Sequence, residues 1–405
     1  MTKTYAIVWP KRFDTLGIQS NDSPIGMLTH DSQYVFSYDS DSLISCSLTM
    51  PVQNRSFNQG HLHPAFEMNL PEGFLRRYIS QRLLRHIKVN DMLFLALQGD
   101  RGIGHLSYKS EMDFGQAQPM AFQDLLTTPM GEGLFEYLLD RYGLTHTLSG
   151  MQPKLLVDTD RSTMAYPNCI VKIGDTDFPD LPVNEFVCMQ LARHVGIDVP
   201  DHHLSDDRNL FVIDRFDLAD GRKLAFEDFC SLMGKQGQDR YDSSYESAAK
   251  VLTLYGALPA DIRKYFERVV FCVCIGNGDA HLKNFGLLYD PLEKQPRPRL
   301  APAYDLTCTL YYDHLDKDLA LKLNQEKRFP NKTTLVQFGT KLGIRQPALI
   351  FEEIHQKVTE GLGTIDVLQD YPDLYKIISD QLSITGVESA TGLKTRPDKR
   401  RKFPK

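Results

Sequence analysis

The chain has 405 residues, with 46 Lys and Arg against 52 Asp and Glu, a formal net charge of −6 and 42% hydrophobic residues. This length allows two or three domains, and the apolar fraction excludes a chain that is disordered throughout. The small negative charge argues against a protein that binds nucleic acid over its whole surface, because neutralising many phosphates needs a clustered excess of Lys and Arg.

The seven cysteines form no C-x-x-C pair and show no histidine spacing typical of a zinc site. The longest apolar run, Val269–Ile275, is far shorter than the roughly 20 residues of a membrane span. The first residues also lack the apolar region of a secretory signal. These features predict reduced thiols, no membrane contact and a cytosolic location, although secretion through a dedicated export system would leave no such mark.

Residues 1–115 are predicted to form an N-terminal α/β subdomain. Short strand-like pieces occur at Thr4–Val8 and Tyr34–Tyr38, and a helix is predicted to begin at Pro71, since proline is favoured in a first helical turn. The apolar residues of this helix recur on one face, at Phe74, Leu75, Tyr78, Ile79 and Leu83. A polar, loop-like stretch at about 110–135 indicates a domain boundary.

A strand-rich unit is predicted over residues 116–235 and a helix-rich unit over 236–385. In the first, TLSGMQPKLLVD and NCIVKIG are typical of strands, VNEFVCMQLARHVG of a helix, and LFVIDRFDL of a strand that runs into a connection. From about residue 240 the apolar residues follow helical spacing, most clearly from Ile262 to Cys274. The basic tail, 386–405, is interpreted as disordered, with a nucleic-acid- or partner-binding arm as the alternative.

The segment GNGDAHLKN, residues 276–284, follows directly after this long helix. Asp279 and Asn284 have the D-x-x-x-x-N spacing of kinase catalytic loops. Phosphoryl transfer to a hydroxyl uses such a pair, a carboxylate that accepts the proton and an amide oxygen that binds Mg²⁺. Asp305, in RLAPAYDLT, is then the expected second Mg²⁺ ligand. The structural alternatives are a capping or turn aspartate at 279 and an Asx turn at 305.

Lys172 is a lone charge in the apolar strand CIVKI. Burying an unpaired ammonium is costly, so Glu185 in the next predicted helix is its expected partner. The alternative is a strand lysine that faces solvent. The segment LSGMQPK occupies the place of a kinase phosphate loop, where Gly150, backbone N–H groups and Lys154 can hold phosphates without a G-x-G-x-x-G pattern.

Together these segments resemble the HipA family of serine/threonine kinases, the toxin components of bacterial toxin–antitoxin pairs. FEMNLPEG is similar to the family's N-terminal domain, SGMQPK to its phosphate loop, NEFVCMQLARHVGIDVP to its lobe helix, DRFD to its hinge, FEDFC to the segment after the hinge, GNGDAHLKN to its catalytic loop and LAPAYDL to its metal motif. They follow in family order from about residue 66 to 306. The resemblance implies an α+β, two-lobed protein-kinase-like fold, with a strand-rich N-lobe, a helical C-lobe and an extra N-terminal α/β subdomain.

Position by position, the resemblance implies Asp279 as the catalytic base and Asn284 and Asp305 as Mg²⁺ ligands. The implied nucleotide-binding residues are Ser149, Gly150, Gln152, Lys154, Lys172, Glu185, Asp214, Phe216, His281 and Lys283. Asp214 and Phe216 would offer hinge backbone groups to adenine. We expect His281 to pack within the loop and assign it no proton transfer.

Family members phosphorylate themselves on hydroxyls just before the loop glycine, so Thr147 and Ser149 are the predicted autophosphorylation sites. Thr147 replaces the usual serine, and Asp214 stands where a glutamate is common. The implied function is an ATP- and Mg²⁺-dependent protein Ser/Thr kinase that modifies a translation component, an aminoacyl-tRNA synthetase. A HipB-like helix-turn-helix antitoxin would inhibit it and provide its only contact with DNA.

Two other functions stay open at this point. G-D-x-H-x-x-N also resembles aminoglycoside kinases, so a small-molecule phosphotransferase is the alternative enzyme. Thr147 and Ser149 discriminate between this enzyme and the protein kinase, because a small-molecule kinase needs no phosphorylatable loop. The other alternative is a kinase-like docking module without catalysis. The full set of Lys172, Asp279, Asn284 and Asp305 argues against it, since sequence drift in a kinase that has lost catalysis tends to remove at least one such group.

Overall fold

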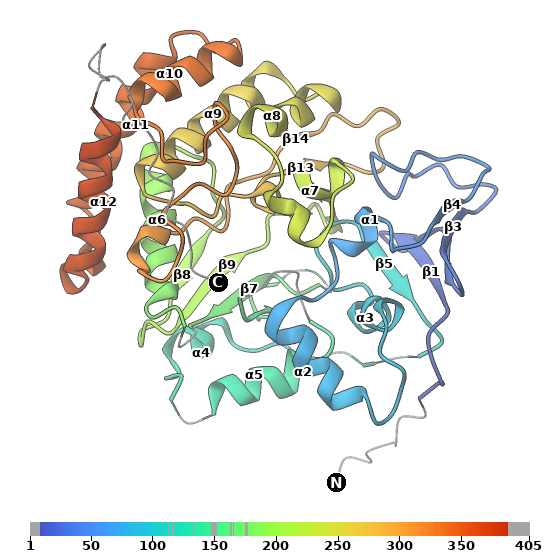
Figure 1. Ribbon diagram of the computed structural model, residues 1–405. Coiled ribbons are helices and arrows are strands. Elements are labelled where there is room, and N and C mark those ends of the chain that lie inside the picture. Colours follow the sequence, from blue (N-terminus) through green and yellow to red (C-terminus); the bar gives the residue numbers. More distant parts are fainter. Residues whose placement is uncertain are drawn as a thin grey trace, which may run out of the picture.

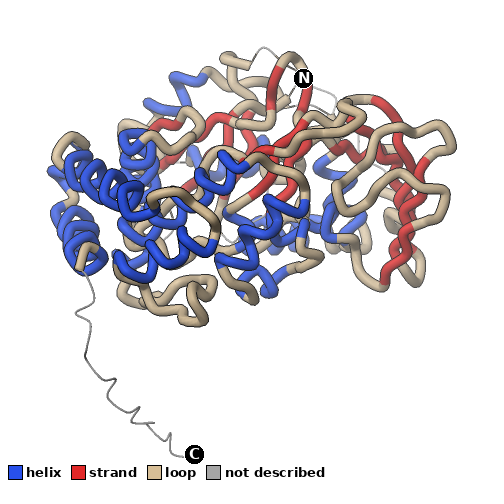
Figure 2. Tube along the Cα trace, turned by 90° about the horizontal axis from the view of Figure 1, so that it is seen from above, coloured by secondary structure: helices blue, strands red, loops and turns tan. Residues whose placement is uncertain are grey.

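The computed structural model describes residues 9–387, apart from residues 113, 116, 132, 147–151, 163, 165, 175 and 176. Buried hydrophobic side chains in these residues form three clusters: one in an N-terminal unit, one on the outer face of a strand-rich lobe, and the largest between that lobe and a group of helices. Figure 1 shows the N-terminal unit beside the other two, and in Figure 2 helices crowd at the end away from the N-terminal sheet. The chain is of the α+β class, as the sequence predicts.

The N-terminal unit contains a five-stranded antiparallel sheet in the order β4-β3-β2-β1-β5. Leu16 and Ile18 alternate with more exposed neighbours along β1, so one sheet face packs against the helices. The strand predicted at Tyr34–Tyr38 is confirmed, whereas Thr4–Val8 lies outside the described residues. The elements are β1 (Thr15–Ser20), β2 (Ser23–His30), β3 (Tyr34–Tyr38), β4 (Phe57–Gln59), α1 (Pro64–Glu67), α2 (Gly73–Leu83), α3 (Asp91–Gln98) and β5 (Leu106–Lys109).

The predicted start of α2 at Pro71 is wrong. The helix begins at Gly73, and Glu72 precedes it in an extended conformation. Gly73 has a φ of 51°, a left-handed conformation that glycine adopts without a steric penalty and that interrupts any helix arriving from Pro71. The chain therefore turns sharply at this point, and Glu72 is left at the tip of the turn.

The strand-rich lobe is an antiparallel sheet in the order β6-β7-β9-β8 with helices on both faces. Along β9, Leu210 and Val212 belong to the cluster that contains α4 and α5, whereas Phe211 and Ile213 belong to the cluster that contains α6. The stretch predicted as loop-like at 110–135 includes α4, so part of it belongs to this lobe. The elements are α4 (Phe122–Thr127), α5 (Leu134–Tyr142), β6 (Lys154–Val157), β7 (Cys169–Ile173), α6 (Leu181–Val195), β8 (His202–Leu204) and β9 (Leu210–Asp214).

The helical lobe carries a small antiparallel sheet, β12-β13-β14, which lies next to the cleft described below. Its helices are α7 (Phe229–Leu232), α8 (Tyr245–Leu254), α9 (Pro259–Cys274), α10 (Lys332–Lys341), α11 (Pro347–Leu362) and α12 (Pro372–Thr385). Its 3-10 helices are η1 (Gly237–Tyr241), η2 (Leu282–Asn284), η3 (Thr309–Tyr311) and η4 (Asp366–Asp370). The remaining strands are β10 (Leu218–Ala219), β11 (Arg222–Lys223), β12 (Ala225–Asp228), β13 (Gly286–Tyr289) and β14 (Arg299–Leu300).

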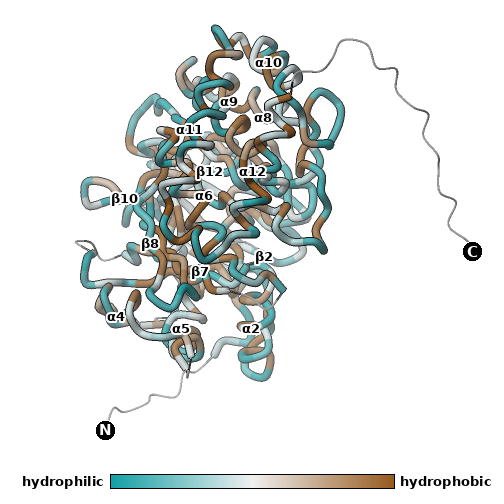
Figure 3. Tube along the Cα trace, turned by 90° about the vertical axis from the view of Figure 1, so that its left-hand side faces the viewer, coloured by the Kyte–Doolittle hydropathy of each residue, from teal (hydrophilic) through white to brown (hydrophobic). Residues whose placement is uncertain are grey.

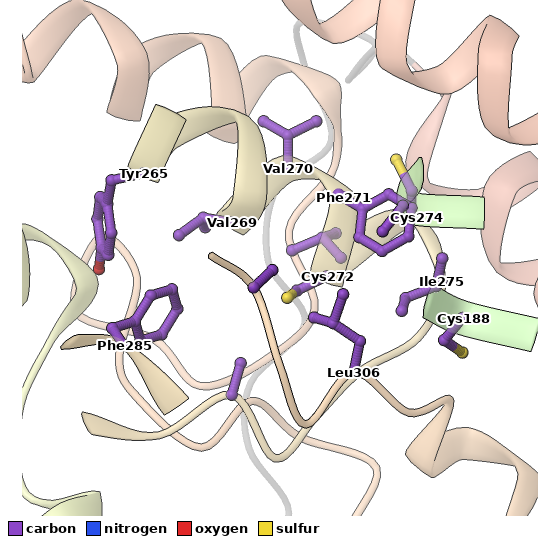
Figure 4. Close-up of a cluster of buried hydrophobic side chains, with 14 of the residues drawn as sticks. Cys188, Tyr265, Val269, Val270, Phe271, Cys272, Cys274, Ile275, Phe285 and Leu306 are labelled. Carbon is purple, nitrogen blue, oxygen red and sulfur yellow. The ribbon is translucent and has the colours of Figure 1, made fainter. Parts of the chain in front are cut away.

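The long helix predicted over Ile262–Cys274 is confirmed as α9, and it runs through the largest cluster. Its second half is buried on every side, and Figure 4 shows its side chains packed beside Cys188, Phe285 and Leu306. All seven cysteines are buried free thiols. In Figure 3 the outer loops are largely hydrophilic, while hydrophobic segments concentrate in the packed interior. Among the described helices, none combines the length and the apolar character that crossing a bilayer requires.

The domain limits at residues 115 and 235 stay predictions, and the tail from 388 lies outside the described residues.

Candidate active site

A cavity of about 290 Å³ lies between the strand-rich lobe and the helical lobe. Side chains of all three units line it, including Met68, Gln98 and Ile103 of the N-terminal unit. The predicted site residues that line it are Gln152, Lys154, Lys172, Asp214, Phe216, Asp279, His281, Lys283, Asn284 and Asp305. Stretches of chain that are far apart in the sequence therefore meet at one cavity.

Two lysines face this cavity from neighbouring strands. Lys154 on β6 lies directly opposite Lys172 on β7, so both side chains are on the same face of the sheet. The Lys172 ammonium lies 2.5 Å from Glu185 Oε1 and also contacts Asp305 Oδ1, while Lys154 Nζ is 3.8 Å from Asp305 Oδ2. Lys172 is only 4% exposed, so the alternative of a solvent-facing lysine is wrong.

The charge state of this group follows from its partners. Burial alone would lower the pKa of Lys172, but the carboxylates of Asp305 and Glu185 raise it above its ordinary value. Burial alone would raise the pKa of Asp305, but Lys154 and Lys172 bring it well below its usual range. Lys172 is therefore an ammonium and Asp305 a carboxylate at neutral pH.

The catalytic-loop segment is held rigidly after α9. The Gly278 N–H donates to Thr309 Oγ1 over 2.7 Å, and a Cβ at Gly278 would lie 2.5 Å from the Asp318 carbonyl oxygen, so only glycine fits. The Asn284 amide oxygen accepts from the His281 N–H over 3.0 Å. These contacts fix the backbone on both sides of Asp279.

Asp279 projects into the cleft, where its side chain is exposed. The Tyr241 hydroxyl donates to its carboxylate over 3.2 Å, so the carboxylate does not serve as a helix cap. Protein around the cleft excludes much of the bulk water, which raises the pKa of Asp279 to about 6; the negative charge of Asp305 adds to this, and the Tyr241 hydrogen bond opposes it. A carboxylate of this kind can accept a proton near neutral pH.

Asn284 and Asp305 lie side by side, with Asn284 Nδ2 3.3 Å from Asp305 Oδ2. Asp305 has a φ of 56°, a sparsely populated conformation for a residue with a side chain, and its carboxylate contacts Lys154, Lys172 and Asn284 in place of an Asx turn. One carboxylate and one amide fit Mg²⁺, which takes one or two protein ligands and completes its shell with phosphate and water. In the described part of the chain, no cluster of three His, Cys, Asp or Glu side chains forms an all-protein metal site.

His281 packs as expected, but its ring Nδ1 is buried without a hydrogen-bond partner among the described residues. Its ring meets the Tyr241 ring edge-on at 5.0 Å, and burial lowers its pKa to about 3, so the imidazole is neutral. Lys283 lines the cavity, but its ammonium lies 2.6 Å from Glu72 Oε1 of the N-terminal unit. The assignment of both residues to the nucleotide stays a prediction.

The predicted hinge contacts stay a prediction, and the structure limits which backbone group of Asp214 is free to make one. Asp214 ends β9, and its backbone N–H donates to the Asp201 carbonyl over 2.8 Å. Of the two Asp214 backbone groups, only the carbonyl can therefore be offered to adenine. The Phe216 ring stacks on Tyr304 at 5.5 Å, forming an aromatic wall beside the hinge.

Three predicted residues, Thr147, Ser149 and Gly150, lie outside the described residues. The structure also adds residues to which the sequence analysis assigned no role: Glu72, Asp228, Arg240 and Tyr241. Glu72 falls within FEMNLPEG, a segment singled out by resemblance alone, and Arg240 and Tyr241 fall in a polar stretch without a motif. Asp228 falls within FEDFC, a segment likewise singled out by resemblance alone, and no local pattern marks Arg240 or Tyr241.

Comparison with known proteins identifies two matching families. The HipA-like C-terminal domain matches residues 146–362, and the HipA N-terminal domain matches residues 16–109. The candidate kinase Y4mE of Sinorhizobium fredii is 27% identical over 374 residues, which cover 83% of this chain and 86% of that protein. The serine/threonine-protein kinase toxin HipA of Shewanella oneidensis is 24% identical over 208 residues, 44% of this chain and 47% of the toxin.

Among solved structures, the complex of Shewanella oneidensis HipA, HipB and operator DNA contains a chain with a TM-score of 0.70 and 19% identity. The match covers 91% of this chain and 96% of that one. This likeness shows that the two chains share a fold over nearly their whole length.

Proposed function

Because this chain belongs to the HipA family, we propose that it is an ATP- and Mg²⁺-dependent protein serine/threonine kinase. The observation that carries the proposal is the meeting of Lys172, Asp279, Asn284 and Asp305 at one cavity between two lobes, with Glu185 paired to Lys172. These side chains come from β7, α6 and two loops of the helical lobe. Each has the chemistry that phosphoryl transfer needs at that place.

The chain's own residues divide the work. Lys154 and Lys172 present two positive charges to the phosphates, and Glu185 holds Lys172 in place. Asn284 and Asp305 would hold Mg²⁺, which neutralises the charge that develops on the phosphates when it is bound. Asp279 orients the hydroxyl of the substrate and accepts its proton. The Asp214 carbonyl and the Phe216 backbone are the proposed contacts for adenine.

We also propose that Thr147 and Ser149 are autophosphorylated and that this switches the kinase off. A dianionic phosphate beside a bound triphosphate would repel it and favour a displaced loop. Replacing both residues with alanine and measuring activity after incubation with ATP tests the switch. Inactivation that persists in the double variant would refute it.

The proposed substrate is an aminoacyl-tRNA synthetase, and the proposed inhibitor is a HipB-like helix-turn-helix antitoxin through which any DNA contact is made. The proposed location is the bacterial cytoplasm. Family membership supports these assignments, together with the HipB and operator DNA in the complex of the Shewanella oneidensis protein. The slightly negative charge of the chain agrees with a partner that provides the DNA-binding surface.

The deciding experiment is intact-mass measurement with peptide mapping of the purified protein after incubation with Mg-ATP. We expect phosphoryl groups on the peptide that contains Thr147 and Ser149, and none when EDTA removes the metal. Nucleotide binding without protein labelling, combined with phosphorylation of an aminoglycoside, would favour the small-molecule phosphotransferase. Absence of nucleotide binding would favour the docking module.

A further inference from the structure

The carboxylate of Glu72 connects the N-terminal unit to the candidate active site. Glu72 stands at the start of α2, but its side chain accepts no hydrogen bond from the first turn of that helix. Instead, Oε1 lies 2.6 Å from the Lys283 ammonium and Oε2 lies 2.7 Å from the Arg240 guanidinium. A single carboxylate of one unit thus joins two cations of another.

This bridge is well shielded from solvent. The side chains of Lys283 and Arg240 are 9% and 5% exposed, and that of Glu72 is 16% exposed. Glu67, on the neighbouring α1, lies 3.8 Å from the Lys283 ammonium. Burial opposes the charge on Lys283, but Asp228, Glu67 and Glu72 together raise its pKa, so the ammonium is retained. Figure 1 shows α1 on the side of the N-terminal unit that faces α7.

Each cation precedes in the chain a residue of the candidate active site. Lys283 directly precedes Asn284. Its carbonyl accepts a hydrogen bond from the hydroxyl of Tyr304 over 2.8 Å, and Tyr304 is the residue immediately before Asp305. Arg240 directly precedes Tyr241, whose hydroxyl donates to Asp279. Each cation that Glu72 binds is therefore next in the chain to a residue of the site. Arg240 precedes Tyr241, which contacts the proposed base, and Lys283 precedes Asn284, the proposed metal ligand.

We propose that Glu72 is a positioning residue, which aligns Asp279 and Asn284 through Arg240 and Lys283 and makes the N-terminal unit a working part of the active site. The expected fall in kcat rests on the proposed kinase function, whereas the expected change in amide hydrogen exchange does not. Misplacing reacting groups by about 1 Å costs on the order of 10²-fold in rate. Loss of the bridge is therefore expected to lower kcat.

The test variant is Glu72→Gln. The glutamine keeps the shape but turns an NH₂ group toward one of two partners that can only donate, so the bridge cannot form on both sides. We expect kcat for phosphotransfer to fall by about 10- to 100-fold, with little change in KM for ATP. Glu72→Asp keeps the charge on a shorter side chain and should recover part of the loss; it also provides a second variant if Glu72→Gln does not fold.

The matched control is Asp91→Asn, which removes the 2.7 Å ion pair between Arg76 and Asp91 within the same unit. Hydrogen exchange gives a readout that needs no activity. Backbone amides of residues 237–241 and 277–285 should exchange faster than in the wild type in Glu72→Gln, and at the wild-type rate in Asp91→Asn. Unchanged exchange in Glu72→Gln, or wild-type kcat in that variant, would overturn the inference. A wild type without phosphotransfer would overturn the proposed kinase function, and the exchange result alone would then decide the role of Glu72.

Discussion

Lys154 and Lys172 lie directly opposite each other on β6 and β7, with both ammonium groups on the face of the sheet that borders the cavity. Like charges in this position destabilise an antiparallel pair. Glu185 and Asp305 offset the repulsion, because Lys172 contacts both carboxylates and Lys154 faces the second.

The first prediction concerns the stability of this group. Lys172→Met leaves the Glu185 carboxyl group buried without its cationic partner, and because burial already raises the pKa of Glu185 to about 7, the group then takes up a proton. We expect a loss of about 3 kcal/mol in the free energy of unfolding. Adding Glu185→Met should recover most of that stability without recovering nucleotide binding. Lys154→Met is the control: its ammonium is 3.8 Å from Asp305, so urea unfolding should change little while ATP binding weakens. Equal destabilisation by the two lysine variants would contradict this account.

The second prediction separates the base from the metal ligands. Asp279→Asn should lower kcat by roughly 10²- to 10⁴-fold and leave Mg-nucleotide binding intact, because Asp279 would act only on the hydroxyl. Asp305→Asn should weaken metal-dependent nucleotide binding as well. Steady-state kinetics and calorimetric titration with a non-hydrolysable ATP analogue measure the two effects. An Asp279→Asn variant that turns over as fast as wild type would exclude this residue as the base.

The third prediction is a pH profile. The pKa of Asp279 is raised to about 6, so the carboxyl group holds its proton below that pH and cannot accept another. The value of kcat/KM should therefore rise as pH increases through about 6 and level off above it. Tyr241→Phe removes the hydrogen bond that stabilises the carboxylate, so the rise should move to higher pH. A rise at the same pH in both proteins would show that another group controls it.

The fourth prediction concerns attachment of the N-terminal unit to the hinge. Arg215 and Asp217 of the hinge form a fully buried ion pair of 2.7 Å. Both also bind the backbone of the N-terminal unit: Arg215 donates to the carbonyls of Arg101 and Gly102, and Asp217 accepts from the Gly104 N–H. Asp217→Ala leaves the guanidinium buried without its counter-charge, at an expected cost of about 3–5 kcal/mol.

The loop that Arg215 and Asp217 hold carries Ile103 into the cavity, so Asp217→Ala should also weaken ATP binding. The control is Glu267→Gln, which breaks the exposed Arg263–Glu267 pair and should cost no more than about 1 kcal/mol. Urea unfolding of both variants compares the two pairs. Similar unfolding midpoints would argue against tight attachment.

Features that a short stretch of chain encodes could be predicted from the residues alone. Helical spacing from Ile262 to Cys274 predicted α9, because one turn places apolar residues on the same face whatever lies beyond it. The spacing of Asp279 and Asn284 marked the loop, and the cost of a buried ammonium pointed from Lys172 to Glu185. The apolar pattern placed the start of α2 at Pro71, because nothing in it shows that Gly73 adopts a left-handed conformation.

Which distant side chains share a cavity depends on how the whole chain folds. Glu72 and Lys283 are 211 positions apart, and nothing near either one indicates the other. Tyr241 and Asp279 are likewise separated by 38 positions, and the hydrogen bond between them forms only where η1 packs beside the loop. Charge partners of this kind depend on how whole units pack, since electrostatic attraction acts on distance in space and not on separation along the chain.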